Sequence, residues 1–178
     1  MTGTLGVLRR LLDGLYKGSG VLAALCLVTI LLLIVAQMVA RWTGELFPGA
    51  PNYAGYVMAA ASFLAFASAL NGGAHIRVSI LLNAVPVRIK WLLEIWCFGV
   101  ATAISAYFVY YAYWFVYWSW KFNEVSQAQD ATPLWIPQSV MVVGGAILTI
   151  AFLDNLISVL FKGESRLGSN IVDQSFGE

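Results

Sequence analysis

The chain has 178 residues, of which 60% are hydrophobic and only 11% are charged, and its mean hydropathy is +0.78. Soluble domains carry about 25% charged residues, so this composition excludes a soluble catalytic domain. Four long stretches contain no charged residue, namely 18–40, 46–74, 95–120 and 131–153. Each is long enough to cross the ~30 Å hydrocarbon core of a bilayer, for which a helix needs roughly 20 apolar residues.

A chain inside a membrane must satisfy its own backbone hydrogen bonds, which leaves helices or a closed barrel. The apolar runs are continuous rather than alternating, which is typical of helices. We therefore predict an all-α integral membrane protein with four transmembrane helices, at about 18–40, 53–73, 91–120 and 132–153. They would form a single membrane domain over 1–161, followed by a polar cytoplasmic tail at 162–178.

The segment before the first predicted helix is itself patterned, because four leucines fall at helical spacing: Leu5, Leu8, Leu12 and Leu15. Two interpretations remain open: an amphipathic helix on the inner leaflet surface, or a cytosolic extension of the first helix. The uncharged run that follows is longer than a typical signal-peptide core and no clear cleavage site follows it. We therefore expect a retained membrane anchor.

The second predicted helix is rich in Ala, Gly and Ser, which let helices approach closely in a membrane. The segment 74–85 behind it is too short to cross and too apolar for water, so we expect a short interfacial helix or re-entrant segment at the cytoplasmic face. We also expect a structural motif there, with no catalytic role, made of Gly72, Gly73, His75 and Arg77.

The end of the third predicted helix is crowded with aromatic rings, and four of them share one face: Tyr107, Tyr111, Trp114 and Trp118. These rings would be either an interfacial belt facing lipid or a docking stripe for another membrane subunit. In the fourth helix, Gly144 and Gly145 lie at mid-membrane and favour close packing, either inside the chain or against a partner subunit.

Basic residues in short loops mark the cytoplasmic side of a membrane protein. The two termini and the connection between the second and third helices carry most of them: Arg9, Arg10, Lys17, Arg77, Arg88, Lys90, Lys162 and Arg166. The other two connections hold only Arg41 and Lys121. We therefore expect both termini in the cytoplasm, and candidate periplasmic contacts at Arg41, Glu45, Lys121 and Glu124.

No ionisable residue lies at the centre of any predicted span, although such residues usually mark the path of a transported charge. Cys26 and Cys97 lack metal-site spacing, and the single histidine cannot form a bis-His haem site within one chain. We therefore expect no catalytic, substrate-binding or metal site and no cofactor in this chain. An accessory role beside a transporting partner fits this interior better.

The stretch from Ala69 to Leu82, which contains Gly-Gly-Ala-His-Ile-Arg-Val, resembles the hallmark of the small membrane (Q-type) subunit of TRAP (tripartite ATP-independent periplasmic) transporters. Arg41 at the end of the first predicted helix and Trp135-Ile136-Pro137 at the start of the fourth also match that family.

The resemblance implies a bacterial inner-membrane scaffold subunit. Its partners would be a large elevator-type permease, coupled to sodium, and a periplasmic protein that delivers an organic acid. Membrane lipid would surround the chain, and nucleic acid is not expected as a partner. The alternative is a membrane anchor of a redox enzyme that binds quinone, or shares a haem with its partner through His75.

Overall fold

The computed structural model describes residues 2–45, 49–71, 87–128 and 130–162. These residues form four α-helices: α1 (Thr2–Thr43), α2 (Ala50–Asn71), α4 (Val87–Lys121) and α5 (Trp135–Lys162). Each contains a segment apolar and long enough to cross a membrane: Arg9–Thr43, Ala50–Leu70, Trp91–Lys121 and Trp135–Phe161. The predicted all-α, four-span membrane fold is therefore confirmed.

Some of the predicted features lie outside the described residues. They are the segment 74–85, the motif of Gly72, Gly73, His75 and Arg77, and nearly all of the tail at 162–178.

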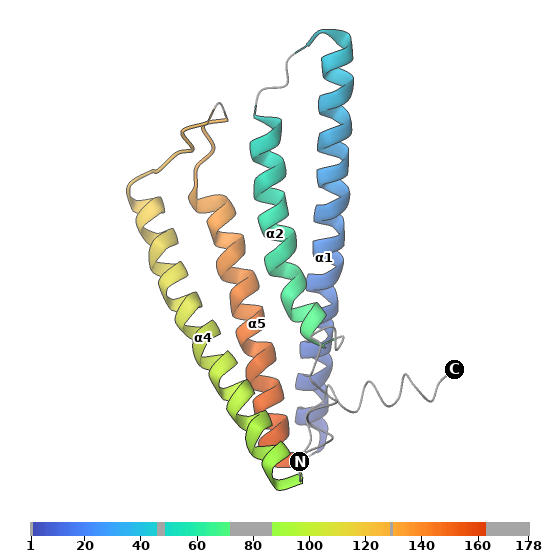
Figure 1. The fold of residues 1–178 in the computed structure, drawn as a ribbon, viewed down its shortest axis with the longest axis vertical. Coiled ribbons are helices and arrows are strands. Elements are labelled where there is room, and N and C mark those ends of the chain that lie inside the picture. The colour runs from blue at the N-terminus through green and yellow to red at the C-terminus, as the bar shows by residue number, and fades with distance from the viewer. Residues whose placement is uncertain (1, 46–48, 72–86, 129, 163–178) are drawn as a thin grey trace, which may run out of the picture.

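The four helices form a single layer rather than a closed bundle (Figure 1). α2 packs against α1 on one side and against α5 on the other, and α5 packs against α4, so the order across the layer is α1, α2, α5, α4. The two outer helices, α1 and α4, each have one main neighbour. Most large apolar side chains of α1 and α4 are consequently exposed within this chain, and a lipid or protein neighbour must cover them in a membrane.

The helices converge at the end of the layer where α1 begins and α5 ends, which we call the terminal end (Figure 1). A small core there consists of Tyr16 from α1, Ala67 and Leu70 from α2, and Ala151 from α5. Phe98 from α4 packs against it, so all four helices contribute. Towards the opposite end, where α1 and α4 end and α2 and α5 begin, the helices splay apart, and we call this the loop end.

α1 is one continuous helix from Thr2 to Thr43, so the residues before position 18 extend the first spanning helix. Tyr16 is only 2% exposed and Leu12 packs beside it, which places this extension against the other helices. At about 1.5 Å per residue, α1 is about 63 Å long and α4 about 52 Å. Both exceed the ~30 Å hydrocarbon core, so each must tilt or project from the membrane.

Candidate partner-binding surfaces

The aromatic face predicted on the third helix lies open on α4, an outer helix of the layer. The exposed fractions are 66% for Tyr107, 54% for Tyr111, 41% for Trp114 and 43% for Trp118. The rings of Tyr107 and Tyr111 lie 4.5 Å apart between centroids, and the Lys121 ammonium lies 4.8 Å above the Trp118 ring. Neighbouring rings thus hold one another in place and leave an ordered apolar surface along α4. We call these four residues the aromatic face.

Gly144 and Gly145, the other two candidates for partner packing, are buried inside the chain. A Cβ atom at Gly144 would lie 2.7 Å from the backbone carbonyl carbon of Phe63, so α5 and α2 are in backbone contact there. A Cβ atom at Gly145 would lie 3.1 Å from the Val109 side chain and 3.3 Å from that of Phe108, on α4. Both glycines therefore lie in contacts between helices of this chain, where α2 and α4 already occupy the space beside them.

The four charged candidates at the loop end differ in their surroundings. Glu124 accepts a hydrogen bond from the Ser119 hydroxyl at 2.7 Å, and Lys121 is held over Trp118. Glu45 is exposed just beyond the end of α1. Arg41 borders a hollow on α1 together with Gln37. Lys121 and Glu124 thus have local structural contacts, which leaves Arg41 and Glu45 as the more available pair.

A polar cluster that sequence reasoning missed lies at the loop end, around Asp130. Its carboxylate accepts hydrogen bonds from the Asn52 amide at 3.1 Å, the Tyr56 hydroxyl at 3.1 Å and the Ser126 hydroxyl at 3.2 Å. Asn52 and Tyr56 are one turn apart at the start of α2, so Asp130 ties the α4–α5 connection to that helix. In the sequence, the spacing of Asn52 and Tyr56 indicates two polar side chains on one face of a helix. It does not identify Asp130 as the acceptor of their hydrogen bonds.

Hydrogen bonding also sets the charge of this cluster. The Thr132 side chain has the largest effect and lowers the pKa of the Asp130 carboxyl below its ordinary value of 3.8. The backbone of Asp130 and the Tyr56 and Ser126 hydroxyls act in the same direction, whereas partial burial opposes them. Asp130 is therefore ionised at neutral pH and acts as an acceptor for all its donors. We interpret the arrangement as a structural clamp, since its donors come both from α2 and from the α4–α5 connection.

The buried polar residues of the spanning helices include a carboxylic acid and an amide. Glu94, one turn inside the spanning part of α4, is 8% exposed, and Asn155 of α5 is 4% exposed. Among the described residues, no group of three or more His, Cys, Asp or Glu side chains is arranged to hold a metal ion.

Comparison with known proteins identifies the family of the chain. A search of curated proteins finds no matching relative. The family model of the tripartite ATP-independent periplasmic transporters, DctQ component, matches residues 30–162, which include the last turns of α1 and all of α2, α4 and α5. That family is a transporter component and not an enzyme family, which favours the transport hypothesis over the redox anchor. The chain therefore belongs to the DctQ component family and is a multi-pass membrane protein of the TRAP transporter type.

Proposed function

We propose that this chain is the small scaffold subunit of a sodium-coupled TRAP system that takes up an organic acid through the bacterial inner membrane. A large elevator-type permease carries the substrate and uses sodium, and a periplasmic binding protein delivers the substrate. The small subunit itself binds neither substrate nor cofactor. Its role is to enlarge the part of the permease that stays fixed while the transporting part slides.

The open aromatic face of α4 is the observation that carries this proposal. An elevator needs a static region with a large contact area in the membrane, and a layer of four helices offers such an area. α4 lies at one edge of the layer and leaves four large rings uncovered by its own chain. Aromatic rings give large contact areas with little loss of side-chain entropy, which suits a permanent subunit interface.

The spans also lack charged groups at their centres. The stretches 18–40, 46–74, 95–120 and 131–153 contain no Asp, Glu, Lys or Arg. A charged solute or sodium ion that crosses a membrane needs polar or charged groups along its path. The transport step is therefore assigned to the partner, and a supporting role remains for this chain.

Reconstitution tests the division of labour. This chain and its large permease partner are placed in liposomes, together or singly, with an inward sodium gradient and substrate-loaded binding protein. We expect solute uptake only when both chains are present. Uptake by the small chain alone would contradict the proposal, and so would undiminished uptake by the large permease alone.

A matched pair of substitutions tests the aromatic face. Trp114 lies on this face and is 41% exposed, whereas Trp120 is 59% exposed and lies on a different side of α4. We expect Trp114→Leu to lower the yield of complex co-purified with the large permease and Trp120→Leu to leave it close to normal. Equal effects of the two substitutions would exclude this face as the interface.

A further inference from the structure

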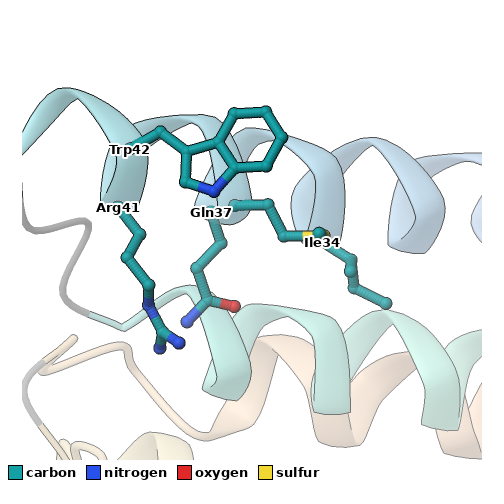
Figure 2. A pocket seen from close by; sticks show the side chains of 5 residues that line it. Ile34, Gln37, Arg41 and Trp42 are labelled. Carbon is teal, nitrogen blue, oxygen red and sulfur yellow. The ribbon is translucent and has the colours of Figure 1, made fainter.

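A shallow hollow of about 270 Å³ lies along the last turns of α1, at the loop end of the layer. Its lining residues are Ile34, Gln37, Met38, Arg41 and Trp42 (Figure 2). The side chains of Gln37 and Arg41 extend from α1 in the same direction, whereas the Trp42 indole lies over α1 and is turned back towards Gln37. Three groups that can donate hydrogen bonds, an amide, a guanidinium and an indole N–H, therefore gather at one end of the spanning segment.

The hollow changes character along the helix axis. Arg41 and Trp42 are in the last turn of α1, whereas Ile34 lies two turns before Arg41, about 10 Å deeper along the axis. Ile34 and Met38 are 45% and 53% exposed, so their apolar surface is open beside the hollow. A cationic rim above an apolar wall matches an amphiphile, whose charged group lies at the membrane surface and whose chain lies in the core.

Arg41 and Trp42, the outer part of this rim, are exposed, and Gln37 is half-buried. α1 extends beyond the start of α2 at the loop end (Figure 1), and Trp42 is 82% exposed. Within the described part of the chain, the Arg41 guanidinium forms no ion pair or hydrogen bond. A guanidinium held at a membrane boundary next to apolar side chains is favourably placed to bind an anion, because its rigid fork of donors matches a phosphate.

We propose that Gln37, Arg41 and Trp42 bind the phosphodiester group of a phospholipid in the leaflet at the loop end of α1. Arg41 bonds the phosphate oxygens with two parallel N–H groups, and the Gln37 amide donates to the glycerol-side oxygens. The indole of Trp42 lies at headgroup depth, where tryptophan is favoured. The acyl chain continues along Met38 and Ile34. The site is independent of the aromatic face, which lies on α4 at the opposite edge of the layer.

Native mass spectrometry of the purified full chain tests the proposal. The chain is titrated with phosphatidylglycerol, with diacylglycerol of the same acyl chains and with glycerol 3-phosphate. We expect phosphatidylglycerol to bind and the other two to bind far more weakly, because each lacks one half of the amphiphile. Arg41→Gln should weaken phosphatidylglycerol binding about tenfold, the effect expected for loss of a charged hydrogen-bond donor.

Lys121→Gln is the matched control, since Lys121 is the basic residue in the last turn of α4 and also lies at the loop end. Lys121→Gln should leave the affinity for phosphatidylglycerol unchanged. Arg41→Lys keeps the positive charge but loses the paired N–H donors of the guanidinium, so its affinity should lie between those of the unaltered chain and Arg41→Gln. Equal losses for Arg41→Gln and Lys121→Gln would reduce the effect to general charge attraction and overturn the proposal. Tight binding of diacylglycerol would indicate an apolar groove without a phosphate site. Tight binding of glycerol 3-phosphate would indicate a site for a soluble phosphate. Either result would overturn the proposal.

A fourth result would also overturn the proposal of a phospholipid site. If Arg41→Gln bound phosphatidylglycerol normally but failed to assemble with the large permease, Arg41 would be a protein contact. Gln37→Leu provides a second variant in case Arg41→Gln does not fold, because it removes the amide donor and keeps the apolar wall. It should weaken phosphatidylglycerol binding less than Arg41→Gln does.

Discussion

Gly144→Ala should separate the two halves of the layer, because the contact between α2 and α5 joins the α1–α2 pair to the α4–α5 pair. The added Cβ atom would lie 2.7 Å from the carbonyl carbon and 2.8 Å from the carbonyl oxygen of Phe63. Ordinary van der Waals contact begins at 3.4 Å, so the helices must move apart by roughly 1 Å. Overpacking of this kind costs about 1–3 kcal/mol. The folded population relative to the unfolded one should therefore fall by about five- to 150-fold.

Equilibrium unfolding in mixed micelles measures this loss, with two glycines of the same chain as controls. At Gly99 on α4, a Cβ atom would meet nothing within 4 Å, so Gly99→Ala should gain up to about 1 kcal/mol from its better helix propensity. Gly145→Ala should be intermediate, because the atoms in its way are the ends of the Val109 and Phe108 side chains, which can rotate.

The order of stability should be Gly99→Ala, then Gly145→Ala, then Gly144→Ala. If Gly144→Ala were as stable as Gly99→Ala, α5 and α2 would not be in backbone contact at this point. The division of the layer into two pairs held by one close crossing would then be wrong.

Three further predictions concern the loop end and the orientation of the chain. Asp130→Ala should speed hydrogen–deuterium exchange at the Leu134 amide by loosening the α4–α5 connection, with a smaller effect for Tyr56→Phe; unchanged exchange in both would argue against a clamp. Because the pKa of Asp130 is lowered in the folded protein, its contribution to stability is present above pH ~4 and is lost as the pH falls through that lowered pKa. Exchange at Leu134 should therefore stay constant from pH 7 to about 4, after correction for intrinsic rates, and a rise near pH 6 would refute the assignment. In whole cells, an impermeant thiol reagent should label Glu45→Cys but not Ser169→Cys, and the reverse pattern would invert the predicted topology.

The spanning helices could be predicted well because each depends only on its own stretch of sequence. An uncharged run of sufficient length has no alternative in a bilayer other than a helix, whatever its neighbours are. The same reasoning explains the exposure of Tyr107 and Tyr111, since a helix crowded with rings on several sides cannot bury all of them in one small chain. The continuity of α1 was less predictable, because an amphipathic pattern is equally compatible with a surface helix and with the start of a longer one.

The sequence could not reveal which helices are neighbours. Gly144 approaches Phe63, and Asp130 binds Asn52 and Tyr56, although each pair is separated by more than 70 positions in the chain. Nothing in the local pattern of one partner identifies the other. Asp130 was overlooked for this reason, since a lone acidic residue in a loop is ordinary until the donors around it are known.

The splay of the four helices has a consequence for the surrounding membrane. Because the helices meet around Tyr16 and separate towards the loop end, the chain is narrow at one bilayer surface and broad at the other. A wedge of this shape displaces unequal numbers of lipids from the two leaflets, and it fits best where the lipid composition or curvature relieves that imbalance. Insertion of the chain would thus be sensitive to the lateral pressure of the bilayer, and that pressure would tend to press the broad ends of its helices together.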